Sequence, residues 1–255
     1  MPFTRINAEK LSQAVVHQIE QLILRGILRP GDRLPSEREL SERLGVSRPS
    51  LREAVAELTA RGLLSTRAGA GIYVADVLGS AFSPALIQLF ATHDTAVFDY
   101  ISFRRDLEGL AAERAAEAGS DTDLAVIDTI MNKMEAAHSK RNPTDEAELD
   151  VQFHLAIIEA SHNVIMLHTM RAMFDLLREG VFYNRQVMFK HRGTRDRLLE
   201  QHRAINSALQ VRDGPAAREA IVAHLTSVEE DLRNLRRAEA NEEIAQRRLA
   251  HERTR

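Results

Sequence analysis

Apolar residues recur with helical spacing in the first sixty residues of the chain. Residues 8–25 predict an amphipathic helix, because their apolar positions fall on one face. That face carries Leu11, Val15, Ile19, Leu22 and Ile23. Ser36 and Glu39 have the spacing of a capping box, which predicts a short second helix ending at Leu44. Gly45 then breaks the pattern.

A third helix and a β-hairpin are predicted after this break. Ser47 is a natural N-cap, and the helix that follows it has an apolar stripe formed by Leu51, Val55 and Leu58. Residues 63–67 and 72–74 read as two short strands around a glycine-rich tip at 68–71. Two short helices joined by a glycine-containing turn and followed by a hairpin indicate a winged helix-turn-helix.

The rest of the chain has helical periodicity almost throughout, with few glycines and no convincing strand. Helices are expected near 84–91, 94–118, 121–139, 143–160, 163–190, 194–212 and 214–237. Asp121, Thr144 and Thr194 are the expected N-caps. The apolar stripes predict an antiparallel all-helical bundle, so the fold class is mostly α.

Four segments follow from these patterns. Residues 1–75 form the expected winged helix-turn-helix domain, and 76–93 a linker with a short helix. Residues 94–237 form the helical domain, and the charged stretch 238–255 is expected to be a frayed helix or tail.

Composition narrows the class of protein. The chain has no cysteine, which excludes disulfides and thiolate metal sites and suits a cytoplasmic protein. No apolar run is long enough to span a bilayer, so no membrane partner is expected. The net charge is −3, but residues 1–75 carry 11 Lys+Arg against 8 Asp+Glu, whereas the remainder carries 23 against 29. A basic N-terminal segment followed by an acidic remainder is typical of a protein that binds nucleic acid at one end.

The candidate DNA-binding residues lie on and around the third helix. Arg48 and Arg52 are one turn apart at its start, where they can reach guanine edges in a major groove. Arg33 and Arg38 are placed for phosphates or the groove edge, although Arg33 has the alternative of pairing with nearby acids. The remaining candidates are Ser47 at the helix start and Gly69 at the wing tip.

Residues 11–74 resemble the DNA-binding domain of the GntR superfamily of bacterial transcription regulators. The resemblance rests on P-G-D-R-L-P-S-E-R-E-L at 30–40, G-V-S-R-P-S-L-R-E-A at 45–54 and the wing pattern G-x-G-x-x-V at 69–74. It implies that Arg38, Arg48, Arg52 and Gly69 contact operator DNA. Ala70 departs from the polar or basic residue common at this position in the family.

The helical region also contains a candidate metal site. Asp150 and His154 share one helix face at i, i+4, while His202 and His224 lie on other mostly apolar helical segments. One carboxylate and three imidazoles suit a borderline divalent cation such as Zn, Ni, Co or Mn. Spacing alone leaves open the alternative that these are ordinary hydrogen-bonded histidines.

Residues 95–235 are similar to the all-helical FCD effector domain of the FadR-like branch of that superfamily. The similar stretches are Arg104–Glu108, Asp150–Asn163, His202–Ile205 and His224–Leu225. The resemblance implies that Asp150, His154, His202 and His224 bind a metal. It also implies that Arg104 pairs with the carboxylate of an effector, and the alternative for Arg104 is a salt bridge to Glu108.

We therefore expect a homodimeric, ligand-responsive transcription regulator, more specifically a repressor, that binds a palindromic operator. A small organic acid such as lactate, pyruvate, citrate or an aldonate would act as effector at the metal. The alternatives are a regulator that senses the metal itself, a structural metal, and a metal-dependent enzyme. The enzyme lacks an evident general base beside the candidate metal ligands.

Overall fold

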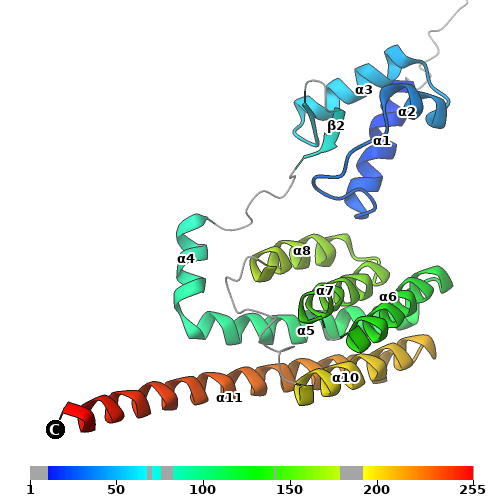
Figure 1. Cartoon of the computed structure of the whole chain (residues 1–255). Helices are drawn as coiled ribbons and strands as arrows, with labels where there is room; N and C mark the ends of the chain where they lie inside the picture. The colour runs from blue at the N-terminus through cyan, green and yellow to red at the C-terminus, as the bar shows by residue number, and fades with distance from the viewer. Residues whose placement is uncertain (1–10, 68–70, 76–82, 141, 179–191, 255) are drawn as a thin grey trace, which may run out of the picture. The chain divides into compact units, whose positions relative to one another are not determined.

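The computed structural model describes residues 11–67, 71–75, 83–140, 142–178 and 192–254. The chain divides into two compact units, residues 1–81 and 82–255, and each is described by itself (Figure 1). No described helix is long and apolar enough to cross a membrane.

The first unit is a winged helix-turn-helix, as the sequence predicts. Its elements are α1 (Leu11–Leu24), α2 (Glu37–Leu44), α3 (Arg48–Ala60), β1 (Leu64–Arg67) and β2 (Gly71–Val74). Helix α1 packs on α3, and the two strands pair antiparallel with Leu64 opposite Val74. One apolar core contains buried side chains from α1, α3, β1 and β2. Helix α2 adds only partly buried side chains to it.

Local capping fixes the turn between α2 and α3. The Ser36 hydroxyl accepts a hydrogen bond from the backbone N–H of Glu39 at 3.3 Å, and the Ser47 hydroxyl accepts one from Ser50 at 3.3 Å. Gly45 adopts φ +65°, a left-handed conformation that costs glycine little. The chain therefore ends α2 at Leu44 and starts α3 within four residues.

The second unit is all-helical in the part of the chain that is described. Its helices are α4 (Pro84–Thr92), α5 (Asp94–Ala118), α6 (Asp121–Lys140), α7 (Pro143–Ala160), α8 (Val164–Arg178), α10 (Arg192–Gln210) and α11 (Gly214–Thr254). Helix α5 runs along α11, while α6 packs against α7 and α10. Two clusters of buried apolar side chains fill the spaces between these helices.

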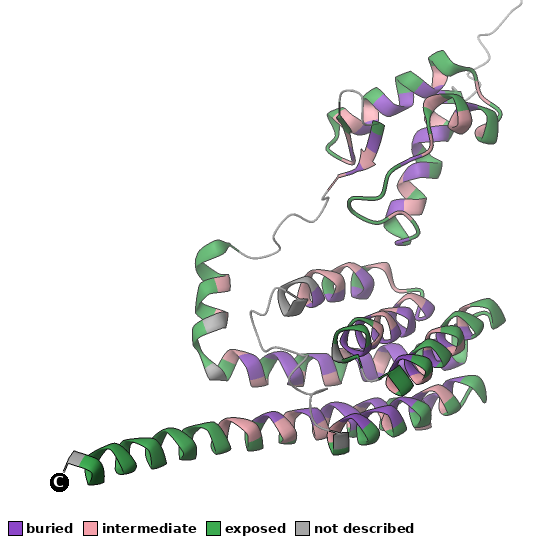
Figure 2. Ribbon diagram, in the orientation of Figure 1, coloured by how far each residue is buried: buried purple, intermediate pink, exposed green. Residues whose placement is uncertain are grey.

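Several expected boundaries differ in the structure. Residues 238–254 are not a separate tail but continue α11, as an exposed helix that Figure 2 shows in green. Alanines and i, i+4 ion pairs such as Glu243–Arg247 stabilise helix without tertiary contacts. The short helix expected within 76–93 is α4, which belongs to the second unit. The expected helix at 163–190 begins at Val164 and is described as far as Arg178.

The expected N-caps of the bundle were also wrong. Ser120 accepts a hydrogen bond from the Asp123 N–H, so it takes the capping role expected of Asp121. Asn142 caps α7 in place of Thr144, and α10 begins at Arg192, before Thr194. Helices α6 and α7 nevertheless begin at the expected residues 121 and 143, and only α10 begins earlier than expected.

Candidate metal centre and nucleic-acid interface

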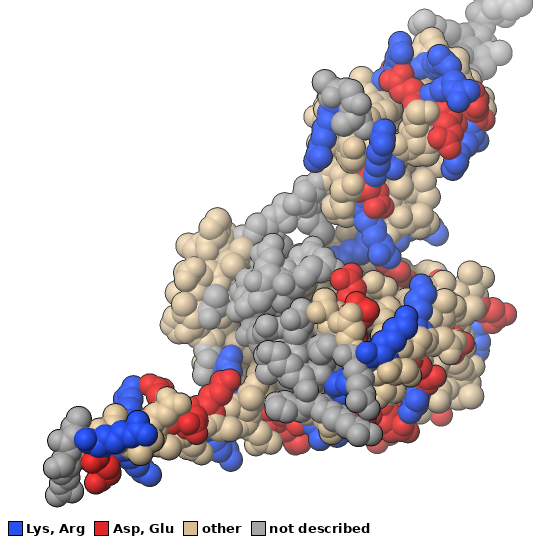
Figure 3. Space-filling model, in the orientation of Figure 1, with Lys and Arg blue, Asp and Glu red and all other residues tan. Residues whose placement is uncertain are grey.

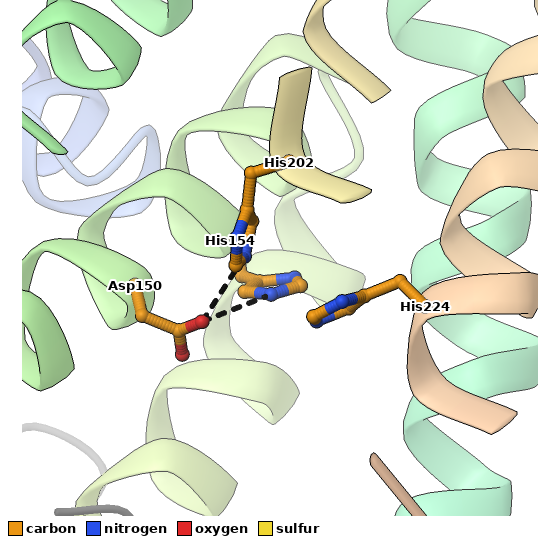
Figure 4. A group of neighbouring side chains, drawn as sticks. All are labelled: Asp150, His154, His202 and His224. Carbon is orange, nitrogen blue, oxygen red and sulfur yellow. Dashed lines mark ion pairs between the residues drawn. The ribbon is translucent and has the colours of Figure 1, made fainter. Parts of the chain in front are cut away.

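The four candidate metal ligands come together inside the second unit (Figure 4). Helix α7 supplies Asp150 and His154, α10 supplies His202 and α11 supplies His224. One potential ligand atom from each residue lies within 4.8 Å of the others. All four residues are at most 3% exposed. Buried titratable groups gathered this closely need a common partner to offset their desolvation, and a metal ion would be one.

The Nδ1 atom of each imidazole faces an oxygen atom, and those of His202 and His224 make hydrogen bonds. His202 Nδ1 donates to the Leu198 carbonyl at 2.7 Å, and His224 Nδ1 donates to Gln201 Oε1 at 2.9 Å. His154 Nδ1 lies 2.5 Å from Glu108 Oε2. In all three rings Nε2 is therefore the nitrogen left for coordination. This is the arrangement that metal-binding histidines commonly have.

Burial favours the neutral, metal-binding form of His154 and His224. It lowers the pKa of His154, although the negative charges of Glu108 and Asp150 oppose the shift. The pKa of His224 falls well below 6.5, because burial and then the neighbouring His202 and His154 disfavour its charged form. A neutral imidazole offers the lone pair that coordination requires. The donor set thus fits a divalent cation that accepts nitrogen and oxygen ligands.

Glu108 is a site residue that the sequence had suggested only as a salt-bridge partner for Arg104. It is 1% exposed and contacts Arg104 Nε through Oε1 at 2.6 Å and His154 through Oε2. Burial by itself raises the pKa of Glu108, but the charges of Arg104 and His154 outweigh it and hold that pKa at about 2. Glu108 is therefore a carboxylate at neutral pH and joins α5 to the metal ligands.

Arg104 is fully buried beside this centre. Besides the pair with Glu108, its guanidinium carbon lies 4.9 Å from the ring centre of Phe174 and 5.8 Å from that of Tyr100. The salt bridge to Glu108, which was the alternative reading of Arg104, is thus present. Its expected contact with an effector carboxylate stays a prediction.

Most candidate DNA-binding residues are exposed on the first unit. Arg38, Ser47, Arg48 and Arg52 all lie on its surface. Arg52 Nε pairs with Glu37 Oε2 at 2.8 Å, and Arg38 lies 3.8 Å from Glu42. Figure 3 shows basic and acidic side chains interleaved over the visible face of this unit. The arginines are accessible, and two of them, Arg38 and Arg52, have acidic neighbours.

The other two candidates lie at the wing. Arg33 forms an isolated β-bridge with Tyr73, and its guanidinium lies over Gly71, where a Cβ atom would come within 3.1 Å of Arg33 Nε. This contact positions Arg33 against the hairpin. Gly69 falls outside the described residues.

Comparison with known proteins identifies both units. The model described as "Bacterial regulatory proteins, gntR family" matches residues 11–74, and that of the FCD domain matches residues 99–227. The chain is 34% identical over 228 residues to the "Glc operon transcriptional activator" of Escherichia coli strain K12, covering 88% of this chain and 90% of that protein. It is 32% identical over 212 residues to the "HTH-type transcriptional regulator LutR" of Bacillus subtilis strain 168, covering 83% and 96%.

A solved structure agrees with these matches. The structure titled "Streptococcus agalactiae GntR" superposes with a TM-score of 0.55 at 28% identity, covering 86% of this chain and 99% of that chain. These relatives are transcription regulators and not enzymes. The chain belongs to the GntR family of bacterial transcription regulators and carries an FCD domain.

Proposed function

We propose that this regulator is a homodimeric repressor whose operator binding is controlled by a small organic acid bound at a divalent metal. The observation that carries the proposal is the buried Asp150, His154, His202 and His224 cluster, in which every histidine Nδ1 faces an oxygen atom and leaves Nε2 for a metal. Zn, Ni, Co or Mn suits these ligands. As a DNA-binding regulator the protein would act in the cytoplasm.

The metal when bound would supply a positive charge for the acid's carboxylate. Arg104 belongs to the same buried cluster through Glu108 and His154, which supports its proposed contact with that carboxylate. A guanidinium suits bidentate binding of a carboxylate. The acid controls DNA binding only if it binds the two states of the protein with different affinity. Lactate, pyruvate, citrate and aldonates are the acids to screen first.

On the DNA side, Arg48 and Arg52 would read base edges from α3, with Ser47 beside them. Arg33, Arg38 and Gly69 would contact the backbone and groove edges. Two protomers would place two copies of α3 on the halves of a palindromic operator. The E. coli relative is named as an activator, so the direction of regulation needs a direct test in a promoter–reporter assay with and without the acid.

A thermal-shift screen of these acids tests the effector, run on the metal-loaded protein, the chelated protein and His202→Ala. A ligand that binds the folded state raises the melting temperature by mass action. We expect one acid to raise it in the loaded protein alone, and the same acid to weaken operator binding. His202→Ala should lose both responses but keep its operator affinity in the absence of acid. An acid response that survives chelation would contradict the metal-anchored site.

A regulator that senses the metal itself is the second candidate. It is favoured by the same four protein ligands, because a nearly complete and buried set can bind a metal tightly without any further ligand. Operator affinity that changes with metal and with none of the acids would select this reading. A metal that affects only the melting temperature would be structural.

A further inference from the structure

A small pocket leads to the metal centre from the side of α6 and α10. It is lined by Met134, His138, Glu146, Arg195, Leu199 and His202. His202 is one of the four candidate ligands and is itself fully buried. His138 is partly exposed, and its partner Asp196 is more than half exposed. The pocket therefore connects a residue near the surface with a residue of the centre.

Carboxylate and imidazole groups lie in this pocket, and Asp196 pairs with His138 at its partly exposed side. His138 Nε2 lies 3.0 Å from Asp196 Oδ1, and His138 Nδ1 lies 3.5 Å from Glu146 Oε2. Glu146 is buried one helical turn before Asp150 on α7. Carboxylate and imidazole groups therefore extend from Asp196 at the surface to the ligands in the interior.

Arg195 limits how tightly these outer groups can hold a cation. Its Nε and Nη2 atoms lie 3.0 and 2.5 Å from the two oxygens of Glu146, and Nη2 also donates to the His138 carbonyl at 2.9 Å. A buried bidentate pair of this kind neutralises the Glu146 carboxylate. A cation passing Glu146 would meet an oxygen ligand but little net negative charge. It would therefore not be trapped before it reached the four inner ligands.

We propose that this row of residues is the path by which the divalent cation enters and leaves the centre. The inference rests on the proposed metal site. A hydrated cation cannot enter a site whose ligands are this deeply buried unless its waters are replaced stepwise. Such replacement ligands are offered by Asp196, His138 and Glu146. The ion would then bind His202 and, after it, the other three inner ligands.

Exchange kinetics test the path separately from the site. Zn²⁺ uptake by the chelated full-length protein and Zn²⁺ release into excess chelator would be timed for the wild type, His138→Asn and Asp196→Asn. Groups that act only along the path change the activation barrier for metal exchange. They leave the free energies of the metal-bound and metal-free states unchanged. We therefore expect uptake and release to slow by the same factor, about tenfold, which corresponds to ~1.4 kcal/mol in the barrier. The affinity and the stoichiometry should stay unchanged.

His162→Asn is the matched control. His162 also pairs with an aspartate, Asp123, at 3.0 Å on the same unit, but it does not line the pocket. Its φ of +53° is one that asparagine adopts readily. Its exchange rates should equal those of the wild type.

Three outcomes would overturn the inference. Unchanged rates in both pocket variants would mean that the ion enters elsewhere, and the metal site would still stand. Faster release with weaker affinity would mean that His138 and Asp196 support the centre itself. If the wild type does not bind Zn²⁺, both the proposed metal site and the proposed path are wrong.

Discussion

Glu108 shows how one side chain can set the geometry of a buried centre. Its Oε2 atom lies 2.5 Å from His154 Nδ1, and His154 Nε2 lies 3.8 Å from Asp150 Oδ1 on the other side of the ring. Its charge also balances that of Arg104. Removing one partner of such a cluster leaves the others buried without compensation.

Glu108→Gln should therefore lower metal affinity by about 10–100-fold, the effect typical of losing a partner that orients a ligand. Competition with a chelator of known affinity measures this. Glu113→Gln, which removes the partner of Arg218 near the surface of the same helix, is the control and should leave the affinity unchanged. Equal affinities in both variants would show that Glu108 does not orient His154.

Acid should destabilise the chelated protein in two steps. His154 and His224 have folded-state pKa values below the ordinary 6.5, so the unfolded chain binds more protons once the pH falls below about 6.5. Stability is then full above this pH and declines below it. Glu108, with its pKa lowered from 4.5 to about 2, adds a second decline between those values.

Melting temperatures of the chelated protein between pH 8 and pH 3 check both steps. A double variant with His154→Gln and His224→Gln should lose the decline below pH 6.5 and keep a smaller decline near pH 4, because Arg104 still lowers the pKa of Glu108. A flat profile from pH 7 to pH 5 in the unmodified chain would contradict the buried neutral histidines.

At the residue scale the sequence could predict Asp150 and the three histidines, because resemblance to the FCD domain marked their positions. It could not assign Glu108 to His154, since α5 and α7 meet only in the fold. Arg195 and Glu146 were missed for the same reason. Pairing between helices depends on how the helices pack, and spacing within one helix gives no signal of it.

Among the elements, α3 is the one that should determine operator affinity. Arg48→Ala and Arg52→Ala should each weaken specific binding by roughly 1–3 kcal/mol if these side chains read bases. Fluorescence anisotropy with an operator duplex and a scrambled duplex of equal length measures the loss. The specific duplex should lose more than the scrambled one.

Arg61→Ala is the control on the same element. Arg61 follows the C-terminal end of α3 and pairs with Glu20, away from the helix start. Its substitution should leave discrimination between the two duplexes unchanged. If Arg48→Ala and Arg52→Ala bind the operator as well as the wild type, α3 is not the reading helix.

Helix bounds were predictable where a glycine or proline marks the end or the start of a helix, as Gly45 does after α2 and as Pro84 and Gly214 do at the start of α4 and α11. The N-caps were wrong where a polar residue just before the helix takes this role, as Ser120 and Asn142 do, although α6 and α7 begin at residues 121 and 143 as expected. The C-terminal end of α11 was also wrong, because its last residues have no apolar stripe and owe their conformation to local propensity.

For the whole molecule, the two units and their fold classes followed from the sequence, because strand periodicity is confined to the first unit. Each unit has its own buried core, and the candidate DNA-binding and metal-binding residues lie in different units. Changes at one set can therefore be made without unfolding the other. This separation is what makes the variants proposed here interpretable.

Helix α11 combines two different local stabilities in one continuous element. Its first half contributes His224, Leu225 and Leu232 to the interior, whereas residues 237–253 are all exposed. Backbone amides in the first half exchange with solvent only when the bundle itself opens, but those near the C-terminus are released by simple fraying. A metal ion that binds His224 would therefore slow exchange at one end of α11 and leave the other end as it was.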